Sequence, residues 1–272
     1  MAYRLVAFDL DGTLLKNDQT LSAENARAIA QMNRQGVQFA ISTGRTYGEV
    51  LPALQEDPNI RFVIHSDGAV IYDKKEDRRH TCCFSGSLQK LVLDTLFGCK
   101  TWFTIRYNGV SYFDGDRCAD QDYDFHRITP YYRALVRSCN VPKTDFQAFC
   151  YGMEEIEQIT VFFHSDEELL FCEKAFRATG LLETSCSSPN SFEVYRADAG
   201  KGNALWKLAD LLGIDRAHTL AVGDTTNDLS IVKAAGLGLA VSNAMKELKE
   251  AADGVICSNE EHAAQYVLAH YL

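Results

Sequence analysis

The chain has 272 residues, which is enough for one large domain or for two smaller ones with a substantial core. Its 46% hydrophobic and 24% charged residues are typical of a soluble globular protein. The formal net charge of −10 argues against a nucleic-acid partner, which would call for a basic face, and no apolar run is long enough to span a membrane.

The N-terminal part of the chain is expected to alternate strands and helices, which predicts a parallel sheet with helices on both faces. Ser22 is a plausible N-cap and Gly36 a plausible C-terminal stop for the first helix. The expected elements are a strand near 3–8, a helix over 22–35, a strand over 37–42, a helix from about Thr46 and a strand over 61–65.

The first expected strand ends in the segment DLDGT at residues 9–13. In open α/β sheets, ligands bind outside the carboxyl ends of the strands. Asp9 and Asp11 suit phosphoryl chemistry there, with one carboxylate to attack, one to move a proton, and a metal between them and the substrate. Because Asp and Gly also favour turns, this segment alone leaves a simple turn open.

The second expected strand runs into Thr43, Gly44 and Arg45. A threonine hydroxyl can donate to a phosphate oxygen, and a glycine lets the backbone approach closely. A helix that opens near Arg45 would offer free N–H groups to an anion. Ordinary helix capping by Ser or Thr is the alternative interpretation.

Between about residues 84 and 197 the pattern changes. The expected strands 101–107 and 111–114 flank Asn108-Gly109, a strong hairpin signal. A strand over 156–164, a helix over 166–179 and a strand over 191–195 are also expected. This mixture of a helix and antiparallel strands predicts a separate, inserted α+β domain.

After about residue 198 the alternation resumes. The expected elements are helices over 201–212, 226–235, 244–251 and 260–270, and strands over 219–223, 237–241 and 254–257. Lys201 begins the first of these helices outside any Walker motif, because no glycine stands five residues before its Gly-Lys pair. A lone lysine is usually solvated, so this position alone does not indicate function.

The strand over 219–223 runs into GDTTND at residues 223–228. The side-chain oxygens of the acids and the asparagine in this segment are ligands that suit Mg²⁺. Helix capping is an alternative role for Asp224 and Asn227. Right-handed crossovers place the strand ends at one edge of the sheet. Asp9, Thr43 and Asp224 should therefore converge.

These segments together resemble the haloacid dehalogenase-like (HAD) superfamily, and most closely its Cof-type branch (class IIB), in which a large α/β cap follows the second motif. The matching segments are DLDGT at 9–13, ISTGR at 41–45, KGNAL at 201–205, GDTTND at 223–228 and VSNAM at 241–245. Among the departures, Asp67 stands where the family often has Asn, and its negative charge could influence substrate choice.

The resemblance implies a doubly wound, Rossmann-like parallel-sheet core over 1–83 and 198–272, with an inserted α+β cap over 84–197. It also implies an Mg²⁺-dependent phosphatase that acts on small phosphorylated metabolites, with sugar phosphates favoured, through an aspartyl phosphate. Asp9 would be the nucleophile and Asp11 the acid and base, assisted by Lys201.

The resemblance further assigns roles to the remaining motif residues. The implied metal ligands are Asp9, the backbone carbonyl of Asp11 and Asp224, with Asp228 orienting them from behind. The phosphate would be held by Gly12, Thr43, Gly44, Lys201 and Asn227. Arg45 and Glu193 are candidates for contact with the rest of the substrate, but a salt bridge for Arg45 and an exposed strand position for Glu193 are favoured over that role.

Three other readings remain open at this point. A sugar-phosphate mutase or phosphotransferase would use the same intermediate, and a regulatory protein on the same scaffold would have no turnover. A dehalogenase is less expected, because it does not need Asp11.

The nine cysteines include no C-x-x-C pair, and the N-terminus shows no signal-peptide pattern, so reduced thiols in a cytoplasmic protein are expected.

Overall fold

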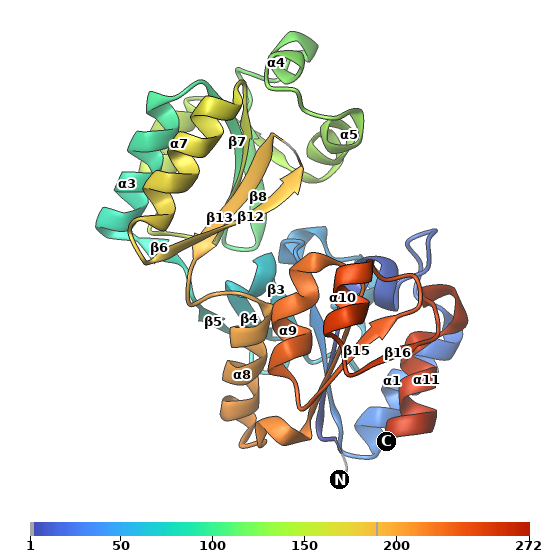
Figure 1. The fold of residues 1–272 in the computed structure, drawn as a ribbon. Coiled ribbons are helices and arrows are strands. Elements are labelled where there is room, and N and C mark those ends of the chain that lie inside the picture. The colour runs from blue at the N-terminus through green and yellow to red at the C-terminus, as the bar shows by residue number, and fades with distance from the viewer. Residues whose placement is uncertain (1–2, 189) are drawn as a thin grey trace. The chain divides into compact units, whose positions relative to one another are not determined.

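The computed structural model describes residues 3–188 and 190–272, and the chain forms two compact units (Figure 1). The first unit contains the segment that ends at Arg45, together with Val50–His80 and Gly200–Leu272. The second unit contains Thr46–Glu49 and Thr81–Ala199. These breaks differ by a few residues from the boundaries expected from the sequence, which did not place Thr46–Glu49 in the second unit.

The first unit is built on an eight-stranded sheet. In spatial order its strands are β16 (Gly254–Ile256), β15 (Leu237–Val241), β14 (Thr219–Gly223), β1 (Leu5–Phe8), β2 (Gln38–Ser42), β3 (Phe62–His65), β4 (Val70–Asp73) and β5 (Arg78–Thr81). The six strands from β16 to β3 are parallel, and β4 pairs antiparallel with β3. The four residues of β1 are fully buried, as expected for the central strand of such a sheet.

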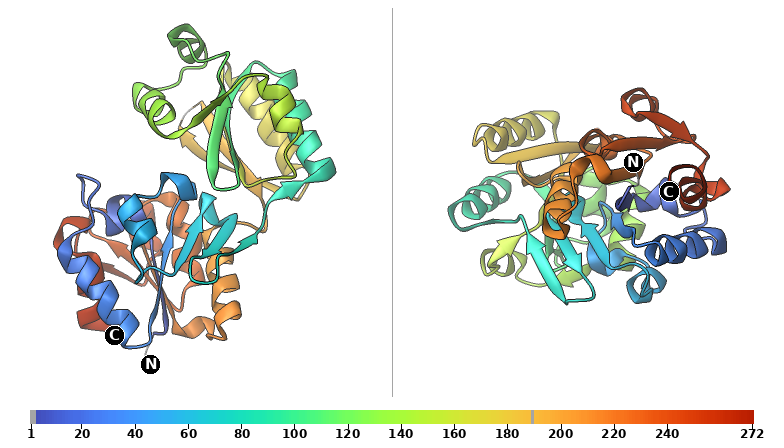
Figure 2. Two further views of the ribbon diagram at one scale, coloured as in Figure 1. Left: turned by 180° about the vertical axis from the view of Figure 1, so that it is seen from behind. Right: turned by 90° about the horizontal axis from the view of Figure 1, so that it is seen from below.

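Helices cover both faces of this sheet, which confirms the doubly wound α/β fold (Figure 2). The helices are α1 (Ala23–Arg34), α2 (Pro52–Glu56), α8 (Lys201–Leu212), α9 (Leu229–Ala234), α10 (Lys246–Ala251) and α11 (Ala263–Tyr271). α1 packs against α11, and α8 packs against α9. The Ser22 side chain caps α1 by accepting a hydrogen bond of 3.1 Å from the backbone N–H of Asn25.

The prediction that a helix begins at about Thr46 is wrong. The chain instead forms a short 3₁₀ turn over Tyr47–Glu49, and α2 begins only at Pro52. Gly48 lowers helix stability by about 1 kcal/mol relative to alanine, and Pro52 lacks the N–H that a helix interior needs. Consequently, no α-helix begins directly after Arg45 to offer its N–H groups to an anion.

The second unit has a six-stranded sheet with helices packed on it. In spatial order the strands are β12 (Leu182–Ser188), β13 (Ser191–Arg196), β11 (Gln158–Phe163), β7 (Thr101–Tyr107), β8 (Val110–Asp114) and β9 (Val141–Lys143). Asn108 and Gly109 join β7 to β8 with φ of 53° and 75°, so the expected hairpin is confirmed. α7 (Asp166–Arg177) also lies where a helix was expected.

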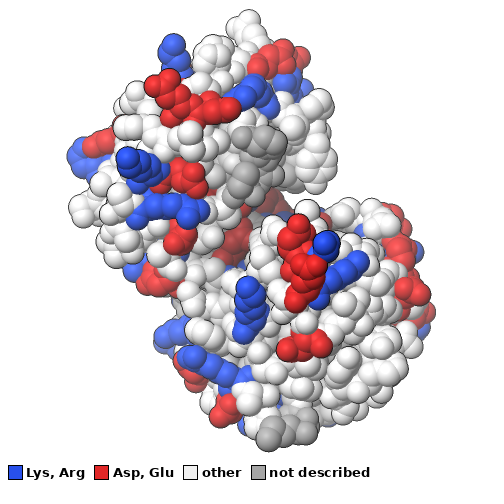
Figure 3. Space-filling view, viewed as in Figure 1, with Lys and Arg blue, Asp and Glu red and all other residues white. Residues whose placement is uncertain are grey.

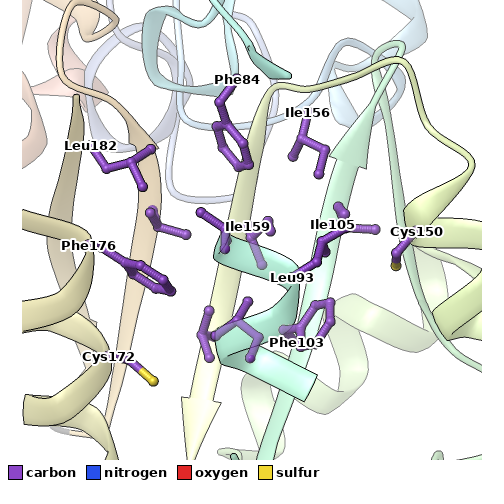
Figure 4. Close-up of a cluster of buried hydrophobic side chains, with 14 of the residues drawn as sticks. Phe84, Leu93, Phe103, Ile105, Cys150, Ile156, Ile159, Cys172, Phe176 and Leu182 are labelled. Atoms are coloured by element: carbon purple, nitrogen blue, oxygen red, sulfur yellow. The ribbon is translucent and has the colours of Figure 1, made fainter. Parts of the chain in front are cut away.

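A continuous apolar core lies between one face of this second sheet and the helices α3 (Gly86–Gly98) and α7 (Figure 4). Ile105 of β7 and Ile159 of β11 are cross-strand partners in that core. The predicted strand over 156–164 covers β11 and the last residue of β10 (Glu155–Ile156). No prediction was made for α3, α4 (Asp120–Phe125), α5 (Pro130–Cys139), α6 (Phe146–Tyr151), β6 (Phe84–Ser85), β9 and β12.

The surface charges are mixed. On the face shown in Figure 3, lysine and arginine side chains are scattered among acidic ones rather than gathered into one basic patch. None of the described helices combines the length with the apolar composition that a membrane-spanning segment requires.

Candidate active site

Three neighbouring strands end at the same edge of the first sheet and carry the motif residues. β1 lies between β14 and β2 and is parallel to both, so Asp9, Thr43 and Asp224 follow strand ends at that edge. The backbone N–H of Asp9 still donates to the carbonyl of Val222, at 3.0 Å, which fixes the end of β1 against β14. The topology thus brings together residues that are more than 200 positions apart.

A buried cluster of three carboxylates lies at this edge. Asp9, Asp224 and Asp228 each have a carboxylate oxygen within 4.8 Å of the others. The ammonium of Lys201 donates to Oδ1 of Asp9 and to Oδ1 of Asp228, both at 2.7 Å. Lys201 is only 1% exposed, so the solvated alternative for this lysine is wrong.

The position of Lys201 depends on the packing of α8. Lys201 is the first residue of that helix, and Gly202 follows it. A Cβ on Gly202 would come within 2.4 Å of the backbone oxygen of Ser230, so only glycine allows α8 to approach α9 this closely. This contact holds the N-terminal turn of α8, and with it the lysine, against the acidic cluster.

The cluster carries more negative than positive charge. Burial, followed by the charge of Asp228, raises the pKa of Asp9 well above its usual range, and Lys201 only partly offsets this. Burial and Asp228 also raise the pKa of Asp224, to about 6. Burial lowers the pKa of Lys201, but Asp228 and Asp9 outweigh that effect and raise it overall. A bound cation would relieve this excess of negative charge.

The donor set fits a hard divalent cation. All three acidic side chains offer carboxylate oxygens, which are the ligands that Mg²⁺ prefers. Asp228 is fully buried, and its Oδ2 accepts the backbone N–H groups of Asp224 and Thr225 at 3.0 and 3.2 Å. That arrangement suits a residue that orients the Asp224 carboxylate from behind.

Gly12, Thr13 and Asn243 lie around the Asp224 carboxylate. No individual role was predicted for Thr13 and Asn243. Gly12 has a φ of +73°, and a Cβ there would lie 2.4 Å from Oδ2 of Asp224. The Thr13 hydroxyl donates to Oδ1 of Asp224 at 3.1 Å, and the Asn243 amide donates to the Gly12 carbonyl at 2.7 Å. The signal for these two residues was their place inside the matching segments DLDGT and VSNAM.

Asp11 faces Arg45 rather than the carboxylate cluster. The Arg45 guanidinium donates from Nε to Oδ2 of Asp11 at 2.8 Å and from Nη2 to Oδ1 at 2.6 Å. A further hydrogen bond joins Arg45 to Gln19. The Asp11 side chain is 46% exposed. The salt bridge that was favoured for Arg45 is therefore present, with the expected acid and base of the reaction as its partner.

The remaining phosphate-site candidates lie in different surroundings. Thr43 is 1% exposed, and its hydroxyl accepts the backbone N–H of Arg45 at 3.1 Å, as a turn residue would. Gly44 lies against the carboxylate of Asp67. Asn227 is exposed, and its Oδ1 accepts the hydroxyl of Thr225.

Glu193, the candidate outside the motifs, belongs to the second unit. It lies on β13, and its carboxylate accepts the Ser185 hydroxyl at 3.1 Å. Its side chain is partly buried, so the exposed strand position favoured from the sequence is wrong.

Comparisons with known proteins find similarity to hydrolases and phosphatases along almost the whole chain. A family model described as haloacid dehalogenase-like hydrolase matches residues 6–268. The phosphatase YwpJ of Bacillus subtilis (strain 168) is 28% identical over 284 residues, which cover 99% of this chain and 100% of the relative. The 5-amino-6-(5-phospho-D-ribitylamino)uracil phosphatase YwtE of the same organism is 30% identical over 285 residues, covering 99% and 98%. A solved haloacid dehalogenase-like hydrolase from B. subtilis aligns with a TM-score of 0.78 at 28% identity, covering 99% and 100%.

Proposed function

The chain belongs to the haloacid dehalogenase-like hydrolases and is a phosphatase of that family, and we propose that it hydrolyses phosphate monoesters of small metabolites with the help of Mg²⁺. The observation that carries this proposal is the buried cluster of Asp9, Asp224 and Asp228 around Lys201. Two buried carboxylates and a partly buried one beside a single ammonium reduce the stability of the fold, and groups perturbed in this way concentrate at functional sites.

Asp9 is the proposed nucleophile. One of its carboxylate oxygens attacks phosphorus, the ester P–O bond breaks, and Asp11 gives a proton to the leaving oxygen. Asp11 then takes a proton from a water molecule that attacks phosphorus. The bond between Asp9 and phosphorus breaks, and inorganic phosphate leaves. The two hydrogen bonds from Arg45 would hold the Asp11 carboxylate in place for these proton transfers.

The phosphoryl oxygens need positive charge and hydrogen-bond donors, because the attacking group is itself an anion. Lys201 supplies an ammonium already placed beside the nucleophile. The proposed phosphate-binding residues are Gly12, Thr43, Gly44, Lys201 and Asn227. Asn227 would first have to give up its hydrogen bond to Thr225.

For Mg²⁺, the proposed ligands are Asp9, Asp224 and the backbone carbonyl of Asp11, with Asp228 orienting the site from behind. When bound, the ion would neutralise negative charge on the phosphoryl group and the carboxylates. The excess negative charge of the cluster supports this assignment. The expected cytoplasmic location of the chain stays a prediction.

We propose that the inserted unit is a cap that recognises the leaving group, and that hydroxylated leaving groups such as sugars are preferred. The second sheet has a polar stretch on the face opposite its α3–α7 core, where Thr104 and Arg106 of β7 pair with Thr160 and Gln158 of β11. Glu193 of β13 is the other cross-strand partner of Thr160. The four side chains of β7 and β11 are buried, with Arg106 donating to Gln158 and the Thr104 hydroxyl bonded to the Tyr132 hydroxyl. A substrate hydroxyl would therefore have to exchange with these existing hydrogen bonds. The relative YwtE is named for a substrate with a phosphoribityl group.

A phosphate-release assay tests the proposal. The panel comprises sugar phosphates, nucleotides, cofactor phosphates and a chromogenic phosphate ester, each assayed with Mg²⁺ and with EDTA. Asp9→Asn is the blank. EDTA-sensitive release that the variant lacks would support the proposed reaction, and the ranking of substrates would identify the preferred class. Failure of the folded protein to release phosphate from any compound would contradict it.

A further inference from the structure

Residues 66–68 form a strained turn that packs against both proposed phosphate-binding segments. Ser66, Asp67 and Gly68 have φ of 49°, 51° and 91°, so three consecutive residues adopt the left-handed region. That conformation is costly for residues other than glycine and persists only where its surroundings enforce it. Strain of this kind is concentrated at functional sites.

The turn is fixed to the segment after β2 by backbone hydrogen bonds. The N–H of Ser66 donates to the carbonyl of Arg45 at 2.9 Å, and the N–H of Asp67 donates to the carbonyl of Thr43 at 3.2 Å. On the other side, a Cβ on Gly68 would come within 2.3 Å of the backbone of Gly200, so the turn also rests on the residue before Lys201. It therefore lies between the two segments.

This position places the Asp67 carboxylate at the proposed phosphate site. Asp67 is 8% exposed. Its two oxygens would lie 3.0 and 3.2 Å from a Cβ on Gly44. Asp67 is also one of the acids whose charge raises the pKa of Lys201, after Asp228 and Asp9, against the lowering effect of burial. A phosphoryl group held by Gly44 and Lys201 must therefore bind beside a further negative charge.

We propose that Asp67 is a specificity-determining residue of this phosphatase, which disfavours bare phosphate dianions and favours esters whose leaving group offers it a hydroxyl or ammonium donor. The inference rests on the proposed function, since it takes Gly44 and Lys201 as the phosphate site. The negative charge of Asp67 repels every phosphoryl group bound at this site and so weakens its binding. Only a substrate whose leaving group donates a hydrogen bond to the Asp67 carboxylate regains that binding free energy. The same repulsion weakens binding of the product, inorganic phosphate.

The substitution Asp67→Asn tests this inference, because it removes the charge, keeps the shape and tolerates the left-handed backbone. Ethyl phosphate and phosphoethanolamine are a matched pair that differ by an ammonium group. In the variant, the preference in kcat/KM for phosphoethanolamine over ethyl phosphate should fall about tenfold, and inorganic phosphate should inhibit at about tenfold lower concentration. The control is Asp77→Asn, which removes a charge at an exposed position with φ of 47° and should leave both quantities unchanged.

Two results would overturn the inference. The first is an Asp67→Asn variant whose substrate preference and phosphate inhibition both stay within about twofold of the original protein, a change too small for the loss of a charge beside a dianion. The second is an unchanged affinity of the Asp67→Asn variant for inorganic phosphate, measured by calorimetric titration in the presence of Mg²⁺. This measurement needs no turnover, so it remains informative even if the chain hydrolyses no ester and the proposed function fails. Tighter phosphate binding by the variant would then still support the role of Asp67.

Discussion

Asp224→Asn should make the metal-free protein more stable near neutral pH, although it removes a proposed metal ligand. Burial and the charge of Asp228 raise the pKa of Asp224 from 3.8 to about 6 in the folded chain. A raised acid pKa means that the folded state binds a proton more tightly than the unfolded state does. This contribution to stability is fully present below about pH 4 and is lost as the pH rises through about 6.

The size of the effect follows from that shift. Two pKa units correspond to about 3 kcal/mol of unfavourable free energy for the ionised, folded form. Because the Asp224 side chain is partly exposed, solvent screening reduces this to about 1–2 kcal/mol. An asparagine avoids that cost and keeps an oxygen that can accept the Thr13 hydroxyl.

Urea unfolding of the EDTA-treated proteins measures the difference. Asp224→Asn should exceed the original chain by about 1–2 kcal/mol near neutral pH, and the gap should close as the pH falls to about 4. Addition of Mg²⁺ should stabilise the original chain more than the variant. Asp210→Asn, at an exposed position on α8, controls for the general loss of an acid. A variant that is equal to or less stable than the original chain in EDTA near neutral pH would refute the electrostatic reasoning.

Three further substitutions test the roles of individual groups. Asp9→Asn should abolish turnover while circular dichroism shows an intact fold, and near-normal turnover of the pure variant would exclude Asp9 as the nucleophile. Lys201→Ala should reduce kcat/KM by well over about tenfold, because the phosphoryl group loses its nearest ammonium, and a smaller loss in steady-state assays would place the lysine outside the phosphate site. Arg45→Ala should lower kcat by about tenfold with a smaller change in KM, because Asp11 loses the hydrogen bonds that Arg45 donates, and an unchanged kcat would show that Arg45 does not position this carboxylate.

Much of the first unit could be predicted from the sequence because its signals are local. Short apolar runs followed by acids or by Thr-Gly mark buried strands that end at a site, and β1, β2 and β14 lie where those runs predicted them. Parallel connection then requires their ends to share one edge. The predicted helix directly after Arg45 is absent because Gly48 lowers helix stability and Pro52 lacks the backbone N–H that a helix interior needs.

The rest depends on contacts between distant segments, which a local pattern does not contain. No local sequence pattern around Lys201 indicates that its side chain is buried. Its burial depends on an ion pair with Asp9, which is 192 positions away in the sequence. A salt bridge was favoured for Arg45, but its partner Asp11, 34 positions away, was not predicted. In the second unit, short helices such as α4 and α6 have only six residues each, too few to show an amphipathic period.

The most direct test of the central claim is to trap the covalent intermediate on Asp9. Asp11→Asn should slow the hydrolysis step, so acid quenching of this variant with a good substrate should preserve the phosphorylated enzyme for peptide mass spectrometry. The mechanism predicts one phosphoryl group on Asp9, absent when Asp9→Asn is added to the variant. A phosphoryl group on another residue, or an unmodified Asp9 in a variant that still releases phosphate, would contradict it.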